Sequence, residues 1–192
     1  KNRIWIGTSE NGISIYDPQK DKFAALSEYY NIPYAIEKAQ ITDICQDIYD
    51  NIWIATWNYG LIRFNTKTNK WHQYTHQQGD NSSLRNNVVQ TLFIDSNNNL
   101  WLGTYNGGSL TRFDYQNEKF VHYDHVPNDP NSLSGRTIQP QGIIEDEEGY
   151  LWIGTWNGLN RFDPETGNFK QYFHEPTNLQ TLSSNHITAL AQ

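Results

Sequence analysis

The stretch Leu151-Trp152-Ile153-Gly154-Thr155-Trp156-Asn157-Gly158-Leu159-Asn160-Arg161-Phe162-Asp163 decides the fold, because the chain contains four versions of it. The other versions begin with Ile4-Trp5-Ile6-Gly7-Thr8, Ile52-Trp53-Ile54-Ala55-Thr56 and Leu100-Trp101-Leu102-Gly103-Thr104. The structural repeat is marked by Trp5, Trp53, Trp101 and Trp152, which are 48, 48 and 51 residues apart. A period of this length with strand-like patterning is typical of a propeller or a related array of sheets.

Each unit divides into four short strand patterns. In the second unit these are residues 41–46, the tryptophan strand, residues 60–65 and residues 70–74. An aspartate opens the turn before each of the last three tryptophan strands, where its carboxylate can cap the turn backbone. Four such strands in meander order make one blade of a β-propeller. We therefore predict an all-β propeller of four four-stranded antiparallel blades, at about residues 1–40, 41–87, 88–137 and 138–186.

The two ends of the chain leave two geometries open. The chain begins on a tryptophan strand, and residues 187–192 have the pattern of a first strand. Residues 187–192 are thus expected to be the inner strand of a further blade or of the first one. We expect an arc of a larger, about seven-bladed ring, with a self-closed ring of four as the alternative. An isolated arc exposes two apolar blade faces, so the remaining blades or a second protomer are expected partners.

Composition excludes several classes of partner. The net charge is −7, and the 14 lysines and arginines are scattered, so no basic stripe is available for a nucleic acid or an anionic membrane. No apolar run is long enough to cross a membrane. Cys45 aligns with Phe93 and Ile144 of later units, which favours a small buried apolar residue over a reactive thiol.

No metal or cofactor is expected. His76, His125 and His174 recur once per unit, and equivalent positions of successive blades diverge around the axis, so they cannot share one ion. Residues 95–99 have calcium-like spacing but lack the closing glutamate of a calcium loop. A turn accounts for residues 95–99 better than a calcium-binding loop does.

The repeats resemble a known family. Ile143-Ile144-Glu145-Asp146, Gly149, Leu151-Trp152-Ile153-Gly154-Thr155, Gly158-Leu159 and Arg161-Phe162-Asp163 are similar to the two-component regulator propeller repeat, as is the connection with Pro127 and Asn131-Ser132-Leu133. The chain departs from that pattern at Ala55, which replaces glycine, and at Gly107-Gly108, which lengthens one turn.

The resemblance implies a function. Propellers of this family are extracytoplasmic sensing parts of hybrid histidine kinases in Bacteroidetes, and they respond mostly to oligosaccharides. It implies a periplasmic location, a polysaccharide-utilisation role and a membrane attachment through parts of the parent protein absent from these 192 residues. Phosphoryl transfer would then belong to the parent, and this chain is expected not to be an enzyme.

The candidate binding residues lie in the turn after each tryptophan strand, which propeller geometry places on the same face as the long inter-blade connections. Aromatic rings there can stack on sugar rings, and Asn or Glu can bind vicinal hydroxyls. The predicted ligand-binding residues are Glu10, Asn11, Trp57, Asn58, Tyr59, Tyr105, Asn106, Trp156 and Asn157. The competing interpretation is that the rings pack the connections and the asparagines only permit tight turns.

Two other functional classes stay open. A sialidase or lyase propeller needs catalytic groups on inner strands near the axis, but the inner-strand patterns offer Thr42, Asp43, Gln90, Thr91, Gln139, Gln141 and Thr188, with no arginine. No pair stands out as general acid and base. A protein-binding propeller scaffold without a small ligand is the second alternative.

Overall fold

The computed structural model describes residues 3–191 as a series of antiparallel sheets. Within each sheet the strands lie in sequence order, and each strand pairs with the next one in that sheet. The strands are β1 (Ile4–Gly7), β2 (Ile13–Asp17), β3 (Lys22–Ala25), β4 (Ile41–Gln46), β5 (Asn51–Thr56), β6 (Leu61–Asn65), β7 (Lys70–Tyr74), β8 (Val89–Ile94), β9 (Leu100–Thr104), β10 (Ser109–Asp114), β11 (Lys119–Asp124), β12 (Ile138–Glu145), β13 (Leu151–Thr155), β14 (Gly158–Phe162) and β15 (Phe169–Tyr172). The predicted all-β propeller is confirmed.

The sheets β4–β7, β8–β11 and β12–β15 have four strands each, but the first sheet, β1–β3, has three described strands instead of the predicted four. Among residues 3–191, no inner strand pairs with the tryptophan strand β1. Residues 187–191 do not form a strand either, contrary to expectation. Ile187 donates its N–H to the carbonyl of Thr155 at 3.1 Å, so this segment lies against the fourth sheet and not the first.

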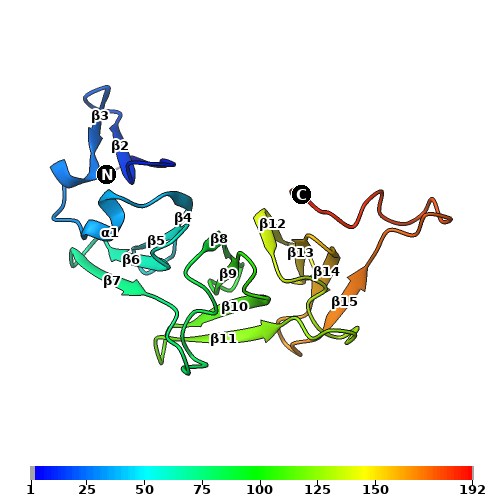
Figure 1. Cartoon of the computed structure of the whole chain (residues 1–192). Coiled ribbons are helices and arrows are strands. Elements are labelled where there is room, and N and C mark those ends of the chain that lie inside the picture. The colour runs from blue at the N-terminus through cyan, green and yellow to red at the C-terminus, as the bar shows by residue number, and fades with distance from the viewer. Residues whose placement is uncertain (1–2, 192) are drawn as a thin grey trace.

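The sheets form an open arc (Figure 1). The inner strands β4, β8 and β12 lie on its concave side, and β7, β11 and β15 lie toward its outer side. The first sheet is at one end of the arc, and the two chain ends are apart, so the four units do not close on themselves (Figure 1).

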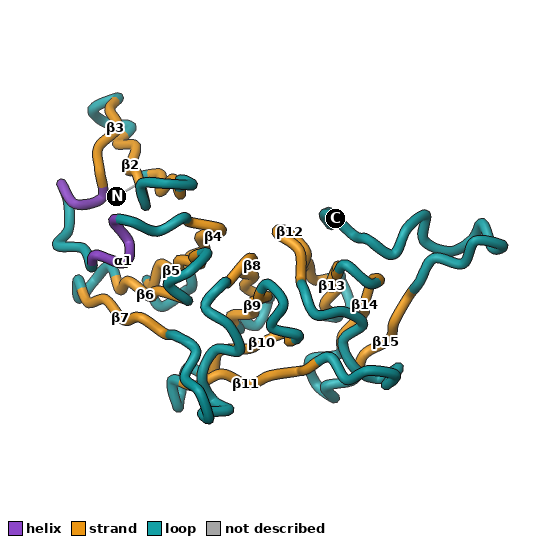
Figure 2. Tube along the Cα trace, viewed as in Figure 1, coloured by secondary structure: helices purple, strands orange, loops and turns teal. Residues whose placement is uncertain are grey.

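Among the described residues, helix occurs only in the first inter-blade connection. It consists of the 3₁₀ turn Leu26–Glu28 and the short α1 (Tyr34–Glu37) (Figure 2). Within residues 3–191, neither helical segment has the length and apolarity that crossing a bilayer requires.

Each interface between neighbouring sheets has its own apolar core. Between the second and third sheets, Trp53, Leu61, Tyr74 and Leu84 pack against Leu92, Leu102, Phe113 and Phe120. Trp53 and Trp101 are fully buried, as the stacking of blades requires. Trp152 is only partly buried, because no further sheet covers the outer face of β12–β15 among the described residues.

A glycine two residues after the tryptophan allows the next blade to approach. A Cβ built on Gly103 would lie 2.6 Å from Cβ of Ile138, and one on Gly154 would lie 2.6 Å from Cγ2 of Ile187. The second unit has Ala55 at this position, and the next inner strand begins with the smaller Val89 in the same core. The departure at Ala55 is therefore matched by a smaller side chain opposite it.

The turn aspartates hold the tryptophans as well as the backbone. The indole N–H of Trp53 donates to Asp47 Oδ2 at 2.8 Å, Trp101 repeats this bond with Asp95 at 2.8 Å, and Trp152 repeats it with Asp146 at 2.7 Å. The other carboxylate oxygen of each aspartate accepts backbone N–H groups of its own turn, as predicted. The polar edge of each of these indoles is thus satisfied, and for Trp53 and Trp101 this occurs inside an apolar interface.

Candidate functional site

The turns after the tryptophan strands β5 and β13 are each built on a buried threonine. Thr56 donates its hydroxyl to the carbonyl of Gly60 at 2.7 Å and accepts the N–H of Tyr59 at 2.9 Å. Thr155 makes the equivalent pair of bonds with Gly158 and Asn157. These bonds fix the turn while the residue directly after the threonine stays at the surface.

The turns are attached to the long inter-blade connections. The N–H groups of Gly60, Gly108 and Gly158 donate to the carbonyls of Asn87, Arg136 and Asn185, at 2.9, 2.8 and 2.6 Å. The turn residues therefore lie on the same face as the connections, which is the placement that the sequence predicted.

Three of the candidate aromatic residues form a continuous row on this face. The ring centroids of Trp57 and Tyr105 are 5.5 Å apart, and those of Tyr105 and Trp156 are 5.7 Å apart. His186 extends the row, with its centroid 5.7 Å from that of Trp156. The row crosses the second, third and fourth blades, and Trp156 is 49% exposed. We call Trp57, Tyr105, Trp156 and His186 the aromatic row.

His186 was missed by the sequence reasoning, although a signal for it existed. It is the residue immediately before Ile187, which begins the stretch with the pattern of a first strand, and the earlier connections have Val88 and Thr137 at this position. The carbonyls of those two residues accept the N–H of Tyr105 and of Trp156. Aligning the ends of the connections would have placed a side chain at this position beside an aromatic turn.

The other predicted residues behave differently. Tyr59 packs against the core between the first two sheets, so its ring is not part of the aromatic row. Asn106 adopts a φ of +51°, which asparagine tolerates, and Asn157 donates its side-chain amide to the carbonyl of Ser134 at 3.0 Å. Asn58 is exposed. The competing interpretation, that asparagines serve the turns, therefore holds in part for Asn106 and Asn157.

The first blade does not extend the row. Its turn has Ser9 where the later blades have Trp57, Tyr105 and Trp156. Glu10 and Asn11 are exposed, and the N–H of Asn11 bonds to Thr8 Oγ1 at 3.2 Å within its own turn. Among the described residues, the aromatic surface is thus confined to the last three blades.

The recurring histidines hold the connections in shape. His76 Nδ1 is 2.7 Å from the carbonyl of Leu84, and His125 and His174 repeat this contact with Leu133 and Leu182 at 2.6 and 2.5 Å. Within residues 3–191 no group of three or more His, Cys, Asp or Glu side chains is placed to hold a metal ion. Cys45 pairs with Trp53 in the β4–β5 ladder, and burial raises the pKa of its thiol.

The inner strands β4, β8 and β12 carry β-bulges near their starts. Burial raises the pKa of Asp43, whose carboxylate accepts the N–H of Leu92 on the next blade at 2.8 Å. Asp43 therefore links adjacent blades. The bulge in β12 is the largest, and it places Gln141 at a φ of +54° with its side chain exposed.

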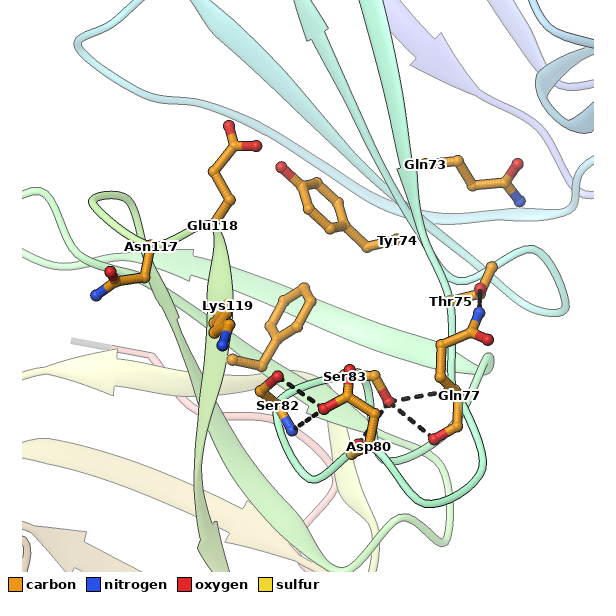
Figure 3. Close-up of a pocket in the computed structure, with 11 residues that line it drawn as sticks. Gln73, Tyr74, Thr75, Gln77, Asp80, Ser82, Ser83, Asn117, Glu118 and Lys119 are labelled. Atoms are coloured by element: carbon orange, nitrogen blue, oxygen red, sulfur yellow. Dashed lines mark hydrogen bonds between the residues drawn. The ribbon is translucent and has the colours of Figure 1, made fainter.

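A small cavity of about 290 Å³ lies at the outer side of the second and third blades (Figure 3). Figure 3 shows Asp80, Ser82 and Ser83 turned toward one another at one end of it. Ser82 donates both its N–H and its hydroxyl to Asp80 Oδ1, and these bonds hold the pKa of Asp80 below its usual value. The polar groups at this end serve the connection between β7 and β8, so we do not regard the cavity as the binding site.

The arc of repeated four-stranded sheets and its aromatic face define the blades of a β-propeller. The sequence pattern of the family described as two component regulator propeller matches residues 36–58, 83–106 and 132–157. These three segments of the chain thus match the repeat that the resemblance indicated.

Individual relatives are similar over different lengths. Over 56 residues the chain is 48% identical to Histidine kinase P4 of Formosa agariphila. The matched stretch covers 29% of this chain and 4% of that protein. The extracellular domain of a B. thetaiotaomicron protein described as a hybrid two component system matches with a TM-score of 0.71 at 24% identity, over 97% of this chain and 23% of that one. The chain therefore spans less than a quarter of either relative.

Propeller enzymes share the fold as well. Virginiamycin B lyase from Staphylococcus aureus matches with a TM-score of 0.61 at 20% identity, over 93% of this chain and 54% of that one. At this level of identity the similarity concerns the fold alone, since one fold supports many unrelated functions.

Proposed function

We propose that the chain is the ligand-sensing, extracytoplasmic propeller of a hybrid two-component sensor, and that it binds an oligosaccharide without transforming it. The repeat family and the similarity to a histidine kinase and to an extracellular sensor domain support the sensor role. In this proposal the parent protein spans the inner membrane, with these blades in the periplasm, and ligand binding controls genes for polysaccharide use.

The aromatic row is the observation that carries the binding proposal. Trp57, Tyr105 and Trp156 present rings from three successive blades at centroid separations of 5.5 and 5.7 Å. A flat aromatic ring covers the C–H face of a sugar ring, and a polar side chain beside it binds the hydroxyls. Exposed Asn58 and the free amide N–H₂ side of Asn106 lie in these same turns. A row across blades fits a chain of sugars better than a single one.

Binding can be measured by isothermal titration calorimetry of the chain against a panel of oligosaccharides of four or more sugars. We expect at least one glycan to bind, and Trp156→Ala to weaken it about tenfold, because a lost stacking contact of this kind is worth roughly 1 kcal/mol or more. Phe23→Ala is the matched control, since Phe23 is an exposed aromatic residue of the first sheet, outside the row. Absence of binding to the whole panel, or equal binding by the Trp156 variant, would refute the proposal.

A protein partner at the same face is the competing function. It would be favoured if no glycan bound while a purified partner bound the chain in a Trp156-dependent manner. Release of a chromophore from a chromogenic glycoside would instead favour an enzyme.

A further inference from the structure

Arg136 occupies a position where two of the other three connections have a structural asparagine. The equivalent residues, whose carbonyls accept the glycine N–H of the adjoining turn, are Ala39, Asn87, Arg136 and Asn185. Asn87 accepts the N–H of His76 at 2.6 Å, and Asn185 accepts that of His174 at 2.6 Å. An arginine side chain has no acceptor, so it cannot make this bond.

The third connection satisfies the same histidine in another way. The N–H of His125 donates to the carbonyl of Gly108 at 2.6 Å, in the turn that Gly107 lengthens by one residue. A Cβ on Gly107 would lie 1.9 Å from Thr104 Oγ1, so the altered turn requires glycine there. The backbone has therefore taken over the role of the asparagine, and the side chain of Arg136 is not needed to hold the connection.

The guanidinium of Arg136 lies at the aromatic row. Its Nε donates to Asn106 Oδ1 at 3.2 Å, and Asn106 directly follows Tyr105. The next residue, Thr137, accepts the N–H of Asn106 on its hydroxyl at 3.0 Å and the N–H of Trp156 on its carbonyl at 3.4 Å. Arg136 is thus attached to both turns that carry the last two large rings of the row.

Arg136 also lacks an acidic partner in the described part of the chain. Arg85, on the other side of the Gly107 turn, is held by Asp124 through two bonds of 3.2 and 2.7 Å, and Arg63 is paired with Glu118 at 2.6 Å. Within residues 3–191 no carboxylate lies within ion-pair distance of Arg136, which is exposed. Its terminal nitrogens are therefore available to a solute.

We infer that Arg136 makes the aromatic row selective for an acidic oligosaccharide, whose carboxylate or sulfate group the guanidinium binds while neighbouring sugar rings stack on Tyr105 and Trp156. The inference rests on the proposed function and narrows its ligand class. A planar guanidinium forms paired hydrogen bonds with carboxylate or sulfate oxygens, which a neutral sugar cannot offer. The net charge of −7 gives the chain no general attraction for anions, so selectivity depends on this local cation.

The test is calorimetry of the chain with three probes of equal length: tetragalacturonate, a sulfated galactan tetrasaccharide and the neutral galactan tetrasaccharide. We expect at least one acidic probe to bind about tenfold more tightly than the neutral one, and to weaken as salt is raised. Arg136→Gln should bring the acidic probe to the neutral level. Comparing the uronate with the sulfate ester identifies which acidic group is recognised.

Lys67→Gln is the matched control for the loss of one positive charge, since Lys67 pairs with Asp50 in turns away from the row. It should leave all three affinities unchanged. Arg136→Lys keeps the charge but loses the planar fork, and we expect an intermediate affinity. Circular dichroism melting of each variant verifies folding.

Three outcomes overturn the inference. Equal affinity for the neutral and the acidic probes, with Trp156→Ala still weakening binding, overturns the inference and leaves the proposed function standing. Acidic binding that Arg136→Gln does not change overturns it in the same way. Failure of all three probes and of the wider oligosaccharide panel overturns the proposed function together with the inference.

Discussion

The hydrogen bond that each turn aspartate accepts from its indole N–H leads to a prediction in which two equivalent sites should respond differently. Asp47 is 5% exposed and accepts hydrogen bonds from the N–H and side-chain amide of Asn51, from the Trp53 indole, and from the Tyr115 hydroxyl on the next blade. Asp146 makes the same bond to Trp152, which no further blade covers. Removing each carboxylate in a separate variant therefore compares the same chemical change in a buried environment and in a solvent-accessible one.

The magnitude follows from the donors left without an acceptor. In Asp47→Ala, the indole N–H of fully buried Trp53 and the amide of Asn51, 7% exposed, lose their partner. An unsatisfied buried donor costs about 1–3 kcal/mol, so the two together predict a loss of about 2–6 kcal/mol in unfolding free energy. In Asp146→Ala, water can reach the Trp152 indole, and the loss should be about 1 kcal/mol.

Urea unfolding of both variants, followed by circular dichroism, measures the two losses. A double-mutant cycle with Trp53→Phe then isolates the Asp47–Trp53 bond, because phenylalanine removes the donor and most of the penalty for losing the acceptor. We expect Asp47→Ala to cost at least 1 kcal/mol more than Asp146→Ala. Equal losses at the two sites, or a cycle without coupling between Asp47 and Trp53, would refute the reasoning.

Three further predictions concern packing between the blades and the stability of the chain at low pH. Gly103→Ala should cost about 1–3 kcal/mol by overpacking against Ile138, whereas Ile138→Val should cost about 0.5–1.5 kcal/mol. The double variant recreates the Ala55 and Val89 pair, so its measured loss of unfolding free energy should be smaller than the sum, and additivity would contradict the steric explanation. Leu84→Ala should lower the unfolding free energy by about 2–5 kcal/mol, because Leu84 is 1% exposed in a core. Leu182→Ala should lower it by only about 1 kcal/mol, because Leu182 lies on the uncovered face. Similar shifts of the thermal midpoint in the two variants would show that this face is covered in solution. Burial tends to raise the pKa of Asp146, but hydrogen bonds from the Trp152 indole and the Tyr150 and Glu148 N–H groups outweigh it and lower the pKa. The stabilisation from Asp146 is therefore present above about pH 4 and is lost as the pH falls through the lowered pKa. Asp146→Asn should reduce the acid-side fall in unfolding free energy, measured by urea unfolding at several pH values. An unchanged stability–pH profile would count against the lowered pKa of Asp146.

The sequence alone was sufficient for the repeat, the four-strand meander and the face that carries the turns. Trp5, Trp53, Trp101 and Trp152 recur at a near-constant spacing, and a strand that is apolar on both faces must be covered on both sides. Because each blade has the same local pattern, the local hydrogen bonds of the turns at Asp47, Asp95 and Asp146 could also be anticipated.

Only the tertiary structure decided which turn residues share a surface. Tyr59 and Trp57 are two residues apart and equally aromatic, yet Tyr59 packs into the core of the first two sheets while Trp57 joins the aromatic row. The place of His186 in the row, the bond of Arg136 to Asn106 and the uncovered face around Trp152 likewise depend on how the blades are stacked. The local sequence pattern determines a blade, because the hydrogen bonds within a blade join residues that are close in sequence. The site lies between blades, where the rotation of one sheet relative to the next determines which side chains meet.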